Sequence, residues 1–413
     1  MNPKEPFPQR AARWLAFGSA VSILFSIAAS QILLALALVA LLLSGAPLRL
    51  PRIKLPLALF LLGTLIAWAF SGNLTAGLPQ IRKFYVFCEL LVVFSSLRDL
   101  ALIRWLFLTW AGFGGIAAGW GLVQFAQKVQ QAREIPSDRY SFYIGERITG
   151  FMSHWNTFSA QEMFALIMLG AFLFFAPAVR ERALWVACAG LLALAILLAE
   201  TRAVWIATAV ACLYLVWFWR RWLVLLVPVV IAIAFLASPS MIRERFTSLL
   251  HAKREDSNEF RKVTWRTGLR MIEAHPLLGL GPEGPKYRFD EFIPADVPHP
   301  RPEGWYGHLH NIYLQYAAER GIPTMLVMMW MLLQILYDFW RGLRGLPAGP
   351  GNRKFLLHGG IAVVLATLVE GFAEYNLGDS EVLTMFLVVV ACGYLALEKD
   401  VVPDDFGAPR EHR

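Results

Sequence analysis

The residues of this chain that are best suited to chemistry lie in the run His308-Leu309-His310-Asn311, which separates a polar segment from an apolar one. An imidazole titrates near neutral pH, so His310 could act as a general base that accepts a proton from a hydroxyl group. His308 could orient the substrate or His310 itself. The alternative is that His310 starts a helix and only hydrogen-bonds a loop carbonyl. A His-x-His pair without a third ligand does not indicate a metal site.

Arginines in three other windows could bind an anion. Arg202 lies at the end of an apolar run, and Arg266 and Arg270 lie in the polar segment before the histidines. A guanidinium group stays charged and bonds phosphate oxygens through two N–H groups at once. We therefore predict an anion site formed by Arg202 and Arg266, with Arg270 and Arg147 as further contributors. The alternatives are snorkelling of Arg202 to lipid headgroups and a solvated face for the others.

A helix over residues 257–274 should present part of this set. An Asp256-x-x-Glu259 start signal precedes it, and Pro276 stops it. Its cations recur every four residues, at Lys262, Arg266 and Arg270. Like charges at this spacing share one face and repel each other. The row is therefore disfavoured unless an anion or carboxylates neutralise it.

The elements that position these residues follow from the composition. Of the 413 residues, 57% are hydrophobic and only 16% are charged, and the mean hydropathy is +0.52. Soluble domains carry about 25% charged residues, and a membrane-spanning helix needs roughly 20 apolar residues. The sequence predicts an all-α polytopic membrane protein with about twelve transmembrane helices. The expected helices are 14–29, 31–45, 55–71, 83–97, 105–126, 155–177, 184–200, 203–219, 222–238, 312–340, 355–375 and 382–397.

The distribution of Lys and Arg in short loops orients these helices, because cytoplasmic loops are richer in both. We expect transmembrane helices 1–9 within residues 1–238, with an external segment at about 127–154. A second external segment at 239–311 precedes helices 10–12 within 312–397, and a cytoplasmic tail covers 398–413. Both termini are then cytoplasmic. Gly321 and Pro323 predict a break in the helix that follows His310.

Several other classes of protein are disfavoured. The four cysteines lie inside apolar runs, so no disulfide framework is implied, and no Cys/His cluster suggests a metal. The net charge of +8 comes from residues between apolar runs, which fits membrane topology better than nucleic-acid binding. His154 with Asn156 is interpreted as a helix cap, with a site-lining role as the alternative. Glu374 and Tyr375 approach the external side, but the sequence gives them no partner.

The pattern His310-Asn311, then nine residues, then Gly321-Ile322-Pro323-Thr324 resembles the signature of the bacterial O-antigen ligases. Their superfamily also includes O-antigen polymerases and some protein O-oligosaccharyltransferases. The long external segment before the motif, the dozen expected helices and the two upstream arginines strengthen the resemblance. It implies that His310 is the functional histidine and that Arg202 and Arg266 are the two functional arginines.

The resemblance further implies transfer of a polysaccharide from undecaprenyl diphosphate to a sugar hydroxyl of lipid A core, at the periplasmic face of the bacterial inner membrane. His310 would deprotonate the hydroxyl, and the anomeric configuration would invert. The external segments contain no Asp-x-Asp, so we expect arginines rather than a metal to balance the diphosphate, and no cofactor. The expected partners are the two lipid-linked substrates and membrane lipids. The substrate-binding residues are predicted to be Arg147, His308, Arg270, Asn311 and Tyr313.

Rival functions are a polymerase or a protein O-oligosaccharyltransferase of the same superfamily, whose acceptors differ. A twelve-helix transporter or flippase is a more distant alternative. Transporters usually gather ionisable groups near the bilayer midplane. Here the chemistry-bearing residues are expected at one external surface, which favours transfer over transport.

Overall fold

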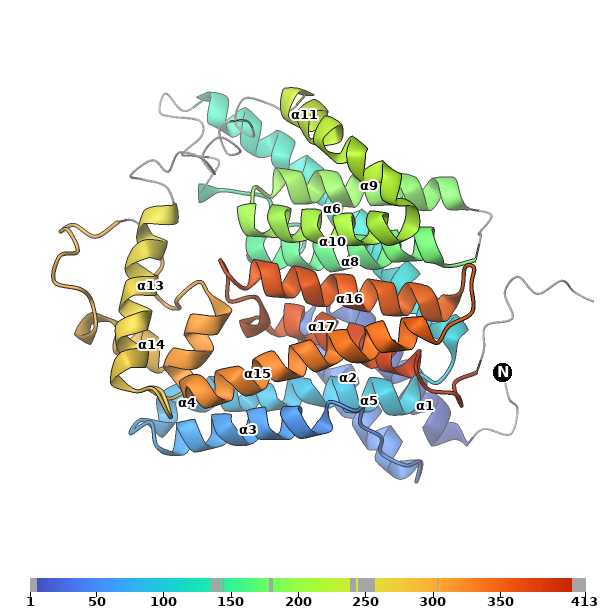
Figure 1. The fold of residues 1–413 in the computed structure, drawn as a ribbon, viewed down its shortest axis with the longest axis horizontal. Coiled ribbons are helices and arrows are strands. Elements are labelled where there is room, and N and C mark those ends of the chain that lie inside the picture. The colour runs from blue at the N-terminus through green and yellow to red at the C-terminus, as the bar shows by residue number, and fades with distance from the viewer. Residues whose placement is uncertain are drawn as a thin grey trace, which may run out of the picture.

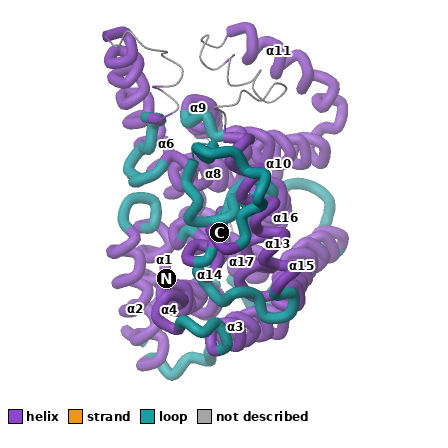
Figure 2. The backbone as a smooth tube through the Cα atoms, turned by 90° about the vertical axis from the view of Figure 1, so that its left-hand side faces the viewer, coloured by secondary structure: helices purple, strands orange, loops and turns teal. Residues whose placement is uncertain are grey.

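The computed structural model describes residues 6–134, 142, 145–177, 181–237, 243, 257–302 and 304–402 of the chain. Within this part the secondary structure is helical, and apart from one isolated bridge between Asp99 and Val402 no strand occurs (Figures 1 and 2). The all-α prediction is confirmed.

The α-helices are α1 (Phe7–Ser22), α2 (Ile27–Leu43), α3 (Lys54–Ala69), α4 (Leu74–Arg82), α5 (Cys88–Ser96), α6 (Leu100–Glu134), α8 (Trp155–Phe175), α9 (Arg182–Leu198), α10 (Arg202–Arg220), α11 (Val227–Ala237), α13 (Ser257–Ala274), α14 (Gly284–Tyr287), α15 (Ile312–Arg344), α16 (Asn352–Glu370) and α17 (Ser380–Leu395). Short 3-10 helices are η1 (Lys83–Phe87), η2 (Arg221–Leu226), η3 (Phe289–Glu291) and η4 (Asn376–Gly378).

Several of these helices have the length and apolarity of membrane spans. The described residues contain five, namely Leu100–Arg133, Trp155–Phe175, Arg202–Leu226, Ile312–Arg344 and Asn352–Glu370. Shorter apolar helices are Ile27–Leu43, Lys54–Ala69, Arg182–Leu198 and Ser380–Leu395. They make the chain a multi-pass membrane protein. The helix expected at 83–97 is interrupted, because η1 precedes α5, whose nine residues rise only about 14 Å.

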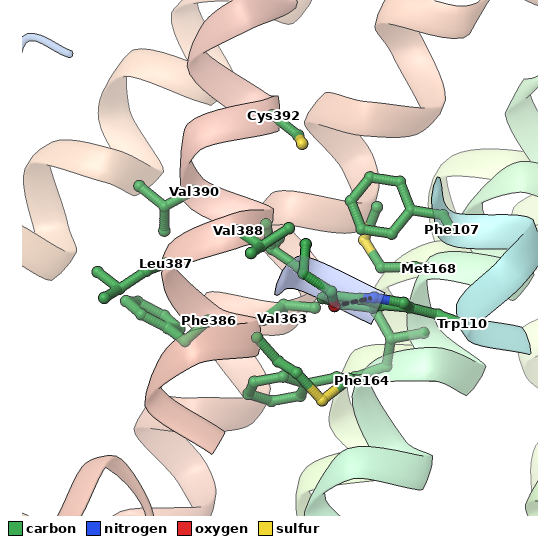
Figure 3. Close-up of a cluster of buried hydrophobic side chains, with 14 of the residues drawn as sticks. Phe107, Trp110, Phe164, Met168, Val363, Phe386, Leu387, Val388, Val390 and Cys392 are labelled. Atoms are coloured by element: carbon green, nitrogen blue, oxygen red, sulfur yellow. Dashed lines mark hydrogen bonds between the residues drawn. The ribbon is translucent and has the colours of Figure 1, made fainter. Parts of the chain in front are cut away.

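Large apolar side chains from distant parts of the sequence fill the interior of the bundle (Figure 3). Trp110 of α6, Phe164 of α8, Val363 of α16 and Phe386 of α17 are all at most 2% exposed. The indole N–H of Trp110 donates to the carbonyl oxygen of Ala20 at 2.8 Å, so its one polar group is satisfied. These helices form the frame from which the loops of the site extend.

The helix that follows His310 is broken, as expected. Gly321 has φ 79° and ψ 161°, so it divides α15 into a short outer portion and a long inner one. A β-carbon there would lie 1.9 Å from the carbonyl oxygen of Leu277, and only glycine fits. The segment before α14 satisfies the freed backbone groups through three hydrogen bonds: Leu280 N to Ala318 O at 2.8 Å, Gly281 N to Glu319 O at 2.9 Å, and Ile322 N to Pro276 O at 2.8 Å.

Helix α13 crosses one end of the bundle, upright at the left of Figure 1. Its bounds, Ser257–Ala274, are those expected from the sequence, although Asp256 of the start signal lies outside the described residues. With the loops that follow it, α13 forms a second apolar core, which includes Val263, Met271, Leu280, Leu309 and Ala318. We call residues 257–302 and 304–311 the cap. The cap is joined to the outer portion of α15, so it carries His310 on the same body.

Candidate active site

His310 is held in an unusual backbone conformation immediately before α15. Its φ is 48°, in the left-handed region that non-glycine residues seldom adopt. The side chain of Asn311 caps the helix by accepting from the N–H groups of Tyr313 and Leu314, each at 3.0 Å. The backbone N–H of His310 donates to Nδ1 of His308 at 3.1 Å. The turn therefore fixes where the His310 ring lies.

The two ring nitrogens of His310 face two different acceptors. Nδ1 lies 3.3 Å from Oε2 of Glu374, and Nε2 lies 3.1 Å from the carbonyl oxygen of Trp305. Glu374 belongs to the loop between α16 and α17, and the start of α15 is tied to that loop by a hydrogen bond from Ile312 N to Gly371 O at 2.8 Å. This tie brings a carboxylate from 64 residues downstream against the imidazole.

Glu374 is also paired with Arg261 of α13. Its side chain is only 7% exposed, and burial alone would raise the pKa of Glu374. The charge of Arg261 and the hydrogen bond from His310 outweigh burial and hold that pKa well below its usual range. Because the carboxylate is ionised, it accepts, and Nδ1 of His310 carries the hydrogen. Arg261, Glu374 and His310 thus form a continuous array.

His308 packs against the array but carries no charge itself. The centre of its ring is 3.9 Å from that of His310 and 4.7 Å from that of Trp305. Burial and the neighbouring His310 lower the pKa of His308 to about 3. His308 is therefore neutral at physiological pH, and it supports the His310 turn as a hydrogen-bond acceptor.

His154, Trp155 and Arg147 form another part of the surroundings. His154 caps α8 by accepting from the N–H of Asn156 at 3.1 Å, as expected. The guanidinium of Arg147 lies 4.4 Å from the centre of the Trp155 ring. Burial lowers the pKa of His154, and its electrostatic neighbours include Arg147, His310 and Glu374. The segment containing Arg147 thus approaches the histidines.

Arg202 and Arg266 occupy different settings. Arg202 is buried in the first turn of α10, which begins at the end of the bundle where α13 lies (Figure 1). Arg266 is 51% exposed and pairs with Asp296 through contacts of 2.7 and 2.9 Å. Helix α13 meets the site through a different face, on which Phe260 packs against His310 and Arg261 pairs with Glu374. The structure does not bring Arg266 to His310.

The other cations of the α13 row are also satisfied within the protein. Lys262 pairs with Glu259 at 2.7 Å, and Nη1 of Arg270 donates to the carbonyl oxygen of Ile293 at 3.0 Å. The carboxylates of Glu259 and Asp296 therefore offset the repulsion expected along this face. An open pocket of about 490 Å³ lies on the same face, and its lining includes Arg266, Arg270, Asp296 and Glu273.

Part of the chain matches a known protein family. A family model described as O-antigen ligase matches residues 187–329. The resemblance to the O-antigen ligase family is confirmed. The match spans roughly a third of the chain and contains Arg202, Arg261 and His310, whereas Glu374 follows it. None of the curated proteins matches the chain.

Two of the residues predicted to bind substrate make hydrogen bonds to the backbone. Nδ2 of Asn311 donates to the carbonyl oxygen of Phe372 at 3.0 Å. The hydroxyl of Tyr313 donates to the carbonyl oxygen of Leu368 at 2.6 Å. Both bonds fasten the start of α15 to the end of α16. Substrate contact by either residue remains a prediction. Within the described chain, no group of three or more potential metal-ligating side chains occurs.

Sequence reasoning did not single out Arg261, and it placed Glu374 on the external side without a partner or a role. The buried residues Phe260, Val263, Thr264 and Met271 mark the inward face of α13, and Arg261 borders that face. The helical periodicity of these buried positions could have separated Arg261 from Arg266. No comparable local signal existed for Glu374, because its partners lie on two other elements.

Proposed function

We propose that this protein is an O-antigen ligase, a glycosyltransferase that moves a polysaccharide from undecaprenyl diphosphate to a sugar hydroxyl of lipid A core. The observation that carries the proposal is the Arg261–Glu374–His310 array, two of whose members lie in the segment matched by the O-antigen ligase model. An ion-paired carboxylate that orients an imidazole is the arrangement by which many enzymes activate a hydroxyl.

In the proposed reaction, Glu374 holds the hydrogen of His310 on Nδ1. The Trp305 carbonyl can only accept, so its contact with Nε2 must open, and Nε2 must give up its hydrogen, before the lone pair of Nε2 is available to the acceptor. Nε2 takes the proton of the sugar hydroxyl as that oxygen attacks the anomeric carbon of the donor. The bond from this carbon to the diphosphate oxygen breaks, and undecaprenyl diphosphate leaves from the opposite face with inversion. The acceptor hydroxyl takes the place of the Trp305 carbonyl, which now lies 3.1 Å from Nε2.

The charge that develops on the diphosphate requires fixed cations. We propose that Arg261 takes the role that the sequence suggested for Arg266, because it adjoins His310 through Glu374. Arg202 and Arg147 are proposed to complete the diphosphate site. Guanidinium groups held in place before the reaction stabilise the leaving group with little reorganisation. Transfer should therefore persist in excess EDTA.

The proposed setting is the bacterial inner membrane, with twelve spans, the cap in the periplasm and both termini in the cytoplasm. Cations at the other end of the bundle support this orientation: Arg49 pairs with Asp400, and Arg353 donates to the carbonyl oxygen of Ala396 at 2.7 Å. Because the array lies at one end of the bundle rather than at its centre, transfer fits better than transport.

The decisive experiment uses the purified protein in proteoliposomes with a lipid-linked donor. Lipid A core, lipid-linked repeat units and a Ser/Thr-rich protein are supplied in parallel as acceptors. We expect transfer to lipid A core, and we expect His310→Ala to reduce it by about 10²–10⁴-fold while the protein still inserts. Transfer only to one of the other acceptors would make the protein a polymerase or a protein O-oligosaccharyltransferase. Unchanged transfer by His310→Ala would remove the proposed mechanism.

A further inference from the structure

Trp305 stands out in the cap because it is a large aromatic residue left open to the surroundings beside the proposed base. Its side chain is 59% exposed, whereas its own carbonyl oxygen lies 3.1 Å from Nε2 of His310. The centre of its ring lies 4.7 Å from that of His308 with the two planes at 84°, so the indole meets this histidine edge to face. The ring of His310 also meets the indole edge to face, with the ring centres 6.3 Å apart.

The loop around Trp305 is fixed, so the exposure is not that of a loose side chain. The neighbouring Tyr306 turns inward, packs on Phe260 and Phe289, and donates its hydroxyl hydrogen to the carbonyl oxygen of Pro302 at 2.7 Å. A β-carbon at Gly307 would lie 2.1 Å from the indole. Glycine there lets the backbone pass directly against the ring. Tyr306 and Gly307 thus hold the indole in a defined position.

An exposed indole at this position suits a carbohydrate. One face of a pyranose ring presents C–H groups, which pack on the electron-rich face of an aromatic ring, while its hydroxyls remain free for polar partners. Leaving an indole open forgoes roughly 25 cal/mol for each Å² of apolar area, so packing of the cap gives no reason for the exposure. The atom beside the indole that would accept the proton of a sugar hydroxyl is Nε2 of His310.

We propose that Trp305 forms the acceptor subsite: a sugar ring of the acceptor stacks on its indole and directs a hydroxyl to Nε2 of His310. This inference rests on the proposed glycosyltransferase function. When the acceptor arrives, its hydroxyl displaces the Trp305 carbonyl from Nε2. Without an acceptor, Nε2 donates to that carbonyl and has no lone pair with which to deprotonate water, so hydrolysis of the donor remains slow.

The kinetic test varies the acceptor at saturating donor, in proteoliposomes, for wild type, Trp305→Ala and Trp305→Phe. We expect Trp305→Ala to raise the KM for acceptor about tenfold and to leave the KM for donor unchanged, because lost stacking is worth about 1.4 kcal/mol. Trp305→Phe should recover most of the loss. Tyr287→Ala is the matched control, since Tyr287 is equally exposed on the cap. An unchanged acceptor KM in Trp305→Ala would overturn the proposal, as would a rise confined to the donor KM.

A binding measurement keeps the proposal testable if Trp305→Ala fails to insert. Wild-type protein labelled with 5-fluorotryptophan is titrated with delipidated core oligosaccharide, and the Trp305 resonance is assigned from its absence in Trp305→Phe. We expect this resonance to shift, and a shift confined to other resonances would overturn the subsite. If wild type binds the oligosaccharide but transfers nothing, the proposed function fails while the subsite stands. If it transfers glycan and the Trp305 resonance stays unmoved, only the subsite fails.

Discussion

Glu374 shows how much of the site depends on one carboxylate. It accepts hydrogen bonds from Arg261 and His310 and is almost fully buried, so no water can readily replace either partner. A buried ion pair that loses one member leaves the other charge uncompensated, which costs far more than the loss of a surface pair. Both the orientation of His310 and the order of the cap should therefore depend on Glu374.

Glu374→Gln tests this dependence. The amide keeps an acceptor near Nδ1 of His310 but loses the charge that stabilises the imidazolium formed during proton transfer. We expect kcat to fall by about 10²-fold or more with a small change in acceptor KM. The readout is initial-rate kinetics in proteoliposomes. Asp296→Asn removes an exposed carboxylate of the same cap and should leave kcat within about twofold of wild type. Equal effects in the two variants would argue against an orienting carboxylate.

The two arginines of α13 give a matched comparison. Arg261→Lys keeps the charge but removes the planar guanidinium that contacts Glu374, so transfer should fall at least about tenfold. Arg266→Lys changes an exposed pair and should leave activity nearly unchanged. Both variants are assayed for transfer at saturating substrates. A loss restricted to Arg266→Lys would return the diphosphate role to Arg266.

His308 gives a pH dependence of stability. The unfolded histidine titrates near 6.5, and burial lowers the pKa to about 3 in the folded protein, so the unfolded chain binds more protons between these values. Stability therefore falls as the pH drops from about 6.5 toward 3, by roughly 1 kcal/mol per pH unit. His308→Asn retains an acceptor for the His310 N–H and should flatten this decline. The measurement is thermal unfolding in detergent at pH 7 and pH 5. Identical pH dependence in both proteins would refute the assignment.

At the scale of elements, the break in α15 joins the cap to the membrane body. The backbone groups freed at Gly321 are satisfied by the segment around Leu280, so helix and cap depend on each other. A helix without this break would carry the outer portion of α15 in another direction and separate His310 from Glu374. The break is thus a condition for the site.

Gly321→Ala should disrupt this junction. The new β-carbon would meet the Leu277 carbonyl at 1.9 Å, and the backbone conformation itself is one that only glycine adopts readily. We expect loss of activity and a thermal midpoint lower by many degrees. Gly72→Ala is the control, because Gly72 also has positive φ (72°) but meets no atom within 4 Å. It should cost only about 1–2 kcal/mol. A similar loss in both variants would show that backbone conformation alone matters.

The whole molecule consists of an apolar helix bundle and a cap that lies across one end of it (Figure 1). This division suits a reaction whose two substrates are both lipids with polar heads. Under the proposed function, polyprenyl chains would lie beside the bundle, and the cap would meet sugars and phosphate at the water–lipid boundary. An array at that boundary would let one site receive both proposed substrates.

The proposed topology predicts opposite labelling of the two ends. In a background without native cysteines, Tyr287→Cys on the cap should react with an impermeant maleimide added to intact cells. Arg344→Cys, at the inner end of α15, should react only after the inner membrane is opened. Labelling is read from the mass shift of the purified protein. The reverse pattern would invert the proposed orientation.

The sequence by itself determined the local features of this protein. Apolar runs located most of the long helices, Pro276 and the start signal bounded α13, and Gly321 with Pro323 predicted the break in α15. Each depends on residues a few positions apart, whose propensities act before tertiary contacts form. Only the tertiary structure decided that Arg261 rather than Arg266 adjoins His310 and that Glu374, 113 residues from Arg261, joins them. Such a pairing depends on how the cap lies on the bundle. A helix start or stop is marked by residues a few positions apart, whereas the packing of distant helix faces has no such local pattern in the sequence.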